Sequence, residues 1–158
     1  RRRHTRSLCD WSSDVCSSDL AIHQESVNGS SKRLYISRGE ASLRQVINEN
    51  EVMDFLSDYD FQSVSLDGMP LHQQIQLFHQ ASHVISAHGG ALTNLVFLSP
   101  DCHVLEIFQS GHGIRPDFFQ LTALAGASYS FSIANSLNAK NDIAIPISVL
   151  RTFLEASL

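Results

Sequence analysis

The sequence lacks long hydrophobic runs, an initiating methionine and, beyond its first 20 residues, all but one cysteine. No apolar segment approaches the roughly 20 residues that a membrane-spanning helix requires, so we expect no membrane segment in this chain. Cys9 and Cys16 lie near the start, and Cys102 by itself allows neither an internal disulfide nor a thiolate metal cluster. Because the chain begins at Arg1, we expect the natural protein to begin upstream.

The first 20 residues differ from the rest because they are rich in Arg, Ser and Cys and show no hydrophobic periodicity. Asp10–Leu20 matches the translation of a widely used sequencing adapter, and Arg1–Arg6 fits the far end of the same oligonucleotide. We therefore interpret residues 1–20 as an adapter-derived artefact and leave them out of the fold reasoning. The alternative is a natural basic tail or a targeting peptide, although the apolar middle of a signal sequence is missing. Residues 21–31 have the composition of a linker.

Basic side chains are scarce in the remainder of the chain. The first 20 residues hold four of the 11 Lys+Arg and three of the 16 Asp+Glu, which leaves 7 basic against 13 acidic side chains and a net charge of −6. An acidic domain is a poor binder of the nucleic-acid backbone. We therefore expect no nucleic-acid partner.

The 158 residues, 43% of them hydrophobic, are enough for one domain with a buried core. From residue 32 onward, short β-branched and aromatic segments alternate with segments of helical periodicity. Asn48 and Glu51 have the spacing of a capping box. The expected strands are 33–37, 61–66, 83–86, 103–108 and 128–133, and the expected helices begin near Asn48, Pro70, Ala91, Pro116 and Ile147. This alternation predicts an α/β fold over residues 32–158, with a Rossmann-like parallel sheet and helices on both faces.

The most informative motif is His88-Gly89-Gly90-Ala91, which follows the apolar run Val84-Ile85-Ser86. Two adjacent glycines let backbone N–H groups approach a ligand without obstruction by Cβ, and the apolar run after them can start a helix whose positive end faces the same place. The motif therefore predicts a phosphate site at the end of a strand. The His88 imidazole can donate a hydrogen bond to a phosphate oxygen, or it can merely cap the turn.

Parallel sheets bind ligands at the carboxyl ends of their strands, where we expect Ser37-Arg38, His88-Gly89-Gly90 and Glu106 to fall. Ser37 and Arg38 end the first strand, and Arg44 follows shortly after. A guanidinium offers paired donors that suit phosphate, although a single arginine can equally be a solvated surface charge. Glu106 interrupts an apolar strand at what we expect to be a buried strand end, which is costly for a carboxylate without a partner. That partner is either a ribose diol or a structural salt bridge.

Other polar residues leave alternatives open. Thr93 and Asn94 would lie in the first turn of a helix, where they bind a ligand or simply cap the helix. Asp58-Tyr59-Asp60 matches the Asp-x-Asp pattern of metal-dependent sugar transfer, but acids at a helix end are usually just solvated. A zinc site is not expected, because no common ligand spacing joins the histidines His72, His79, His83, His103 and His112.

A hydrolase is a further alternative, because His-Gly-Gly also occurs in the oxyanion loops of α/β-hydrolases. That reading needs a Gly-x-Ser-x-Gly nucleophile elbow. The nearest segment, Gly126-Ala127-Ser128-Tyr129-Ser130, lacks the second glycine and opens a strand. The sequence therefore offers no esterase nucleophile.

In order and spacing, these residues resemble glycosyltransferase family 61. The resemblance spans residues 33 to about 155 and is carried by Tyr35-Ile36-Ser37-Arg38, Arg44, Asn48-Glu49-Asn50-Glu51, His88–Asn94, Ser99-Pro100 and Val104–Phe108. One departure is Gly90, where many members have alanine.

The resemblance implies an inverting glycosyltransferase of GT-B-like architecture, with this chain as the donor-binding C-terminal half. Its substrates would be a nucleotide-diphosphate sugar and a glycan or polysaccharide acceptor, without a cofactor or metal. Arg38 and His88–Ala91 would hold the diphosphate, Thr93 and Asn94 would support it, and Glu106 would face the ribose. The implied donor-binding set is Ser37, Arg38, Arg44, His88, Gly89, Gly90, Ala91, Thr93, Asn94 and Glu106.

We therefore expect a fragment of a glycosyltransferase, possessing the donor site but lacking the half that commonly supplies the catalytic base. Such a chain would bind a nucleotide diphosphate weakly and transfer no sugar. Capsular or surface polysaccharide synthesis in the bacterial cytoplasm is the expected setting. The alternative is an inactive nucleotide-binding or structural α/β module.

Overall fold

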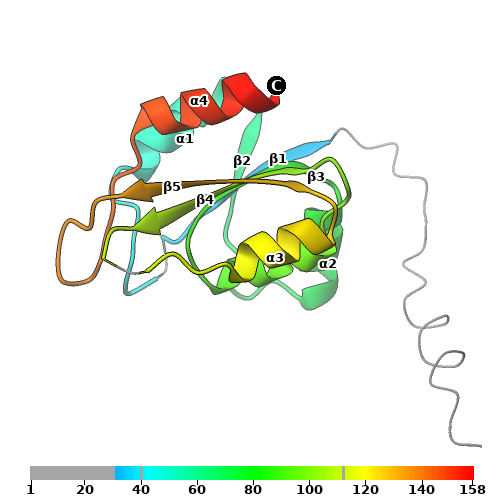
Figure 1. Ribbon diagram of the computed structural model, residues 1–158, viewed down its shortest axis with the longest axis horizontal. Helices are drawn as coiled ribbons and strands as arrows, with labels where there is room; N and C mark the ends of the chain where they lie inside the picture. Colours follow the sequence, from blue (N-terminus) through cyan, green and yellow to red (C-terminus); the bar gives the residue numbers. More distant parts are fainter. Residues whose placement is uncertain (1–30, 40, 112) are drawn as a thin grey trace, which may run out of the picture. The chain divides into compact units, whose positions relative to one another are not determined.

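The computed structural model describes residues 31–39, 41–111 and 113–158. The interpretations of residues 1–20 as adapter and of the following linker, apart from Ser31, lie outside the described residues. Strands and helices alternate along the chain, as the sequence predicts (Figure 1). The strands are β1 (Lys32–Ile36), β2 (Phe61–Val64), β3 (Ala81–Ala87), β4 (His103–Gln109) and β5 (Ser128–Ala134). The helices are α1 (Glu49–Ser57), α2 (Leu71–His79), the 3₁₀-helix η1 (Gly90–Phe97), α3 (Asp117–Leu124) and α4 (Ile147–Ser157).

The five strands form one sheet in the order β2-β1-β3-β4-β5. Every neighbouring pair is parallel, which confirms the predicted fold class. After β1 the chain adds β2 on one side, and it then returns to add β3 on the other side. The order therefore reverses between β1 and β3, and in open parallel sheets the crevice for ligands lies at the carboxyl ends of the strands at such a point.

Two hydrophobic cores lie on opposite faces of the sheet, because alternate strand residues point to opposite sides. On β1, Tyr35 packs with residues of α1 and α4, whereas Leu34 and Ile36 pack with residues of α2 and η1. Figure 1 shows the same layers, with α1 and α4 on one side of the sheet and α2 and α3 on the other. The sheet thus fixes which loops meet at its carboxyl edge.

Two local expectations are corrected by the structure. Asn48 is at the N-cap position of α1 but makes no capping hydrogen bond. Its amide instead pairs with the backbone of Ile145, with Nδ2 donating to the carbonyl (3.0 Å) and Oδ1 accepting from the N–H (2.9 Å). The segment after the glycine turn is a 3₁₀-helix because its buried leucines, Leu92, Leu95 and Leu98, recur every three residues.

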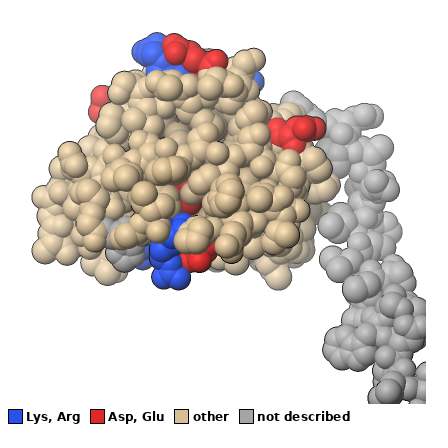
Figure 2. All heavy atoms as spheres, viewed as in Figure 1, with Lys and Arg blue, Asp and Glu red and all other residues tan. Residues whose placement is uncertain are grey.

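The surface of the domain is sparsely charged on the face that Figure 2 displays, where charged side chains occur in small groups, some mixed and some acidic only. No broad basic surface is visible on that face. Among the described residues, none of the helices combines the length and apolar character needed to cross a bilayer.

Candidate functional site

The turns after β1 and β3 meet at the point where the strand order reverses. Ile36 at the end of β1 pairs with Ser86, one residue before the end of β3. Just beyond the strands, Arg38 Nη1 donates a hydrogen bond to the His88 carbonyl (3.2 Å). The structure therefore brings together Arg38 and the glycine turn, two elements that are 50 residues apart in the chain.

Gly89 is the reason that Arg38 can approach so closely. A Cβ placed on Gly89 would lie 1.8 Å from Arg38 Nη1 and 3.1 Å from Cζ, whereas one placed on Gly90 would have no neighbour within 4 Å. Gly89 is buried and Gly90 is exposed. The two glycines thus have different roles, because Gly89 accommodates the guanidinium and Gly90 leaves the turn open to solvent.

The electrostatic environment of Arg38 is unusual for an arginine. Burial lowers its pKa, the neighbouring positive charge of Arg44 lowers it further, and Asp67 partly offsets both effects. In the part of the chain that the structure describes, neither arginine forms a salt bridge. Arg38 Nε is buried without a hydrogen-bond partner. Two adjacent cations without a carboxylate partner form a site that favours an anion.

Backbone donors complete this anion site. The N–H of Leu92 bonds to the Gly89 carbonyl (3.0 Å), but the N–H groups of Gly90 and Ala91, the first two of η1, bond to no backbone carbonyl of the described residues. A helix N-terminus with unpaired N–H groups attracts negative charge. Ser37 follows the end of β1, and its Oγ accepts from the N–H of Gly39 (3.1 Å), which shapes the turn after β1.

Arg44 is held in position by a distant part of the chain. It has a positive φ of 60°, and its N–H donates to the Lys140 carbonyl (3.0 Å). The next N–H, that of Gln45, donates to Asp142 Oδ1 (2.8 Å). Hydrogen bonds to Asp142 from Asn138 and Gln45 lower the pKa of its carboxyl group. The loop before α4 therefore determines where Arg44 lies.

Glu106 is in the middle of β4, fully buried, and not at the strand end that the sequence analysis assigned to it. His88 Nδ1 pairs with its Oε1, and the Tyr129 hydroxyl donates to its Oε2 (2.5 Å). The His88 ring also stacks on Phe108, with centroids 4.9 Å apart. Of the two partners considered from the sequence, the structure shows an internal pair, with His88, and Glu106 presents no surface to a ligand. Burial, followed by the bond to Glu106, raises the pKa of Tyr129 and keeps it a donor.

Thr93 and Asn94 are neighbours on η1, but only one of them is accessible to a ligand. Thr93 is exposed on η1, so its hydroxyl is accessible. Asn94 is buried, and its Nδ2 donates to Gln74 Oε1 (2.9 Å) and to the Ala91 carbonyl (3.1 Å). Asn94 therefore joins η1 to α2, a structural role that differs from the helix cap considered from the sequence.

Buried polar atoms without partners mark the same edge of the sheet. Among the described residues these atoms are Tyr35 Oη, Arg38 Nε, Glu49 Oε1 and Gln109 Nε2. Tyr35 and Gln109 lie near the carboxyl ends of β1 and β4, Arg38 follows β1, and Glu49 begins α1. The sequence analysis used Tyr35 and Glu49 only within the motifs that carry the family resemblance, and it selected neither these nor Gln109 as site residues, because nothing local indicates a binding role for them.

The alternative metal motif lies at the opposite edge. Asp58 and Asp60 flank the turn that leads into the amino end of β2, whereas the anion site lies at the carboxyl ends of β1 and β3. Among the described residues, no three His, Cys, Asp or Glu side chains are grouped so that they could hold a metal ion.

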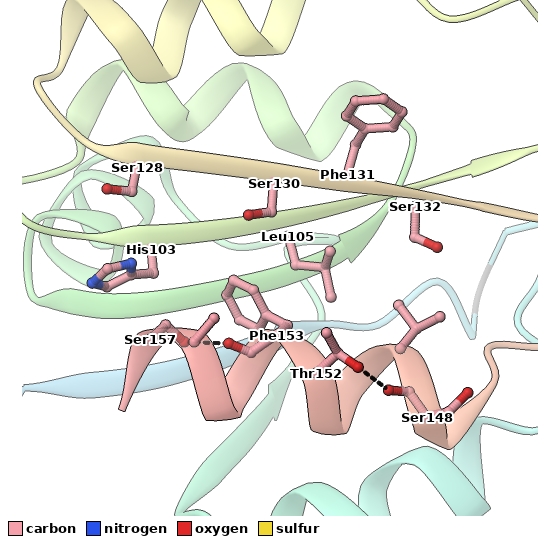
Figure 3. Close-up of a pocket in the computed structure, with 12 residues that line it drawn as sticks. His103, Leu105, Ser128, Ser130, Phe131, Ser132, Ser148, Thr152, Phe153 and Ser157 are labelled. Atoms are coloured by element: carbon pink, nitrogen blue, oxygen red, sulfur yellow. Dashed lines mark hydrogen bonds between the residues drawn. The ribbon is translucent and has the colours of Figure 1, made fainter.

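A cavity of about 590 Å³ lies elsewhere, between β5 and α4 (Figure 3). Its lining includes His103 and Ser128, the first residues of β4 and β5, and none of the predicted donor-binding residues. Two of its hydroxyl groups bond to carbonyls within α4, from Thr152 to Ser148 (3.0 Å) and from Ser157 to Phe153 (2.8 Å).

The fold and these residues define a parallel α/β domain with a candidate anion site where the turns after β1 and β3 meet. Comparison with known proteins is more specific, since the family model described as Glycosyltransferase 61 matches residues 2–105. The chain belongs to glycosyltransferase family 61. The match includes every predicted donor-binding residue except Glu106, and it begins inside the segment interpreted as adapter, so that interpretation stays a prediction.

Curated relatives agree with this family. The chain is similar to the EGF domain-specific O-linked N-acetylglucosamine transferases of Drosophila melanogaster (34% identity over 47% of this chain) and Bos taurus (29% over 70%). It is also similar to the beta-1,2-xylosyltransferase RCN11 of Oryza sativa subsp. japonica, with 46% identity over 32% of the chain. The matched regions cover 15%, 21% and 9% of these relatives.

Among solved structures, the chain is similar to a diflavin flavoprotein A3 from Nostoc sp., with a TM-score of 0.49 and 11% identity. The alignment covers 80% of this chain and 87% of that chain.

Proposed function

We propose that this domain binds the diphosphate of a nucleotide-sugar donor and serves glycosyl transfer. The observation that carries the proposal is the position of Arg38, whose guanidinium is packed on Gly89 beside a second arginine, without a salt-bridge partner among the described residues. A diphosphate offers the negative oxygens that both guanidinium groups and the two N–H groups of η1 lack.

The same donors would assist the reaction. When the bond from the sugar to the diphosphate breaks, negative charge develops on the leaving phosphate oxygen. Donors that are fixed before the reaction stabilise this charge without reorganising, which lowers the barrier. We propose that Arg38, Arg44 and the N–H groups of Gly90 and Ala91 supply this stabilisation, and that no metal ion is needed.

Finer features of the proposal follow from the family. They are inverting transfer, a GT-B-like whole enzyme, and a glycan or polysaccharide acceptor in capsular or surface polysaccharide synthesis. The relatives are named for N-acetylglucosamine and xylose transfer, so these are the first donor sugars to test. A bacterial cytoplasmic location stays a prediction.

Calorimetric titration of the chain with uridine diphosphate, with and without EDTA, tests the proposal. We expect saturable binding that EDTA leaves unchanged and that Arg38→Ala weakens at least tenfold, since a hydrogen bond to a charged group contributes about 1.5–3 kcal/mol. Thr93→Ala, on the exposed side of η1, shows whether that hydroxyl also contributes. A folded chain that binds no nucleotide would contradict the proposal.

A further inference from the structure

The carboxylate of Glu49 lies at the same loop as Arg38, but it needs hydrogen-bond donors, whereas Arg38 needs acceptors. Glu49 is the first residue of α1, and its Oε2 is 3.8 Å from where a Cβ of Gly39 would stand, so it faces the turn after β1. Its other oxygen, Oε1, is buried without a hydrogen-bond partner. A buried carboxylate oxygen is stabilised only by donors, so its partner must carry an O–H or N–H group.

The Tyr35 hydroxyl is the second unpartnered group at this place. Tyr35 is fully buried in β1, and its Oη has no hydrogen-bond partner. Burial raises the pKa of Tyr35, and the negative charge of Glu49 and a side-chain interaction with the same carboxylate raise it further. The phenol therefore stays protonated and can donate to the buried Oε1 of Glu49, which leaves Oε2, facing the turn after β1, for a ligand.

We propose that Glu49, positioned by Tyr35, binds a hydroxyl group of the nucleotide-sugar donor. Arg38 and Arg44 require acceptors, Glu49 requires donors, and a nucleotide sugar is a ligand that carries both within a short distance. This subsite takes the hydroxyl-binding role that the family resemblance implied for Glu106, whose two oxygens are already bonded to His88 and Tyr129. The inference rests on the proposed function, because it places the hydroxyl group next to the bound diphosphate.

The hydroxyl could belong to the ribose or to the transferred sugar, and three ligands separate these sources. Inorganic pyrophosphate contains neither, uridine diphosphate contains the ribose, and uridine diphosphate N-acetylglucosamine contains both. The three would be titrated into the full chain and into Glu49→Gln. The matched control is Asp54→Asn, which removes the same charge from an exposed position on the same helix.

We expect Glu49→Gln to bind pyrophosphate as well as the unchanged chain does and to bind uridine diphosphate about tenfold more weakly, while Asp54→Asn changes neither. If only the sugar nucleotide is weakened, the hydroxyl belongs to the transferred sugar, and the subsite is still supported. Tyr35→Phe keeps the ring and should weaken the same ligands by a smaller factor, about threefold. It provides the test should Glu49→Gln fail to fold.

Two results would overturn the subsite alone. These are unchanged binding of both nucleotides by Glu49→Gln, and a loss that is equal for all three ligands, pyrophosphate included. If the unchanged chain binds none of the three, the proposed function fails, and this inference fails with it.

Discussion

The packing of Arg38 on Gly89 makes a quantitative prediction for Gly89→Ala. The new methyl group would stand 1.8 Å from Arg38 Nη1, and real Cβ contacts are essentially never shorter than 3.0 Å. The guanidinium must therefore move, and its 3.2 Å hydrogen bond to the His88 carbonyl is lost. Because the side chain is flexible, we expect a modest fall of about 1 kcal/mol in the free energy of unfolding.

Gly89→Ala should reduce the free energy of pyrophosphate binding more than it reduces the free energy of unfolding. A displaced guanidinium no longer makes a charge-assisted bond to the anion, which is worth about 1.5–3 kcal/mol, or about a tenfold to hundredfold change in Kd. Calorimetry measures this change directly. Gly90→Ala is the matched control, because its methyl group would meet nothing within 4 Å and should leave the affinity unchanged.

A double-mutant cycle isolates the cause. If Gly89→Ala acts by displacing Arg38, it should have no further effect on pyrophosphate affinity once Arg38 is already alanine. Additive losses would refute the steric explanation, and so would wild-type affinity in Gly89→Ala. Equal losses in Gly89→Ala and Gly90→Ala would show that the turn as a whole, and not this contact, binds the anion.

Three further predictions concern stability, each measured by urea unfolding. Glu106→Gln should lower the free energy of unfolding by about 2 kcal/mol, because an amide nitrogen cannot accept a hydrogen bond where a buried carboxylate oxygen does, while exposed Glu155→Gln should not. Asn48→Ala should cost about 2–4 kcal/mol, because it leaves both buried backbone groups of Ile145 unpaired. Burial raises the pKa of Cys102 to about 12. The free energy of unfolding should therefore fall above about pH 9, where the unfolded thiol ionises and the folded one does not. Cys102→Ala should reduce that fall.

The order of strands and helices could be predicted because it depends on local patterns. Alternating residues, Pro70 and Pro116 before helices, and the glycine turn after β3 each signal structure within a few positions. The 3₁₀ form of η1 was missed, although the three-residue spacing of its buried leucines was visible in the sequence. The hydrogen bonds of Asn48 to the backbone of Ile145, which replace the expected cap, could not have been predicted, since Ile145 is 97 residues away.

The site was predicted only where chemistry is tied to a single local motif. His88, Gly89 and Gly90 form such a motif, and Arg38 follows a strand end. Arg44 is different, because its position depends on the loop at Lys140. Nothing local indicates that Glu106 meets His88 and Tyr129, because this contact arises only when β3, β4 and β5 lie side by side.

Glu106 and Arg38 differ in the hydrogen-bond partners that the fold provides for them. Glu106 is buried, and its two oxygens already pair with His88 and Tyr129. Arg38 has only backbone carbonyls as hydrogen-bond acceptors among the described residues, at His88 and Leu43. The positive charge of its guanidinium has no salt bridge there, so it can pair with an incoming anion.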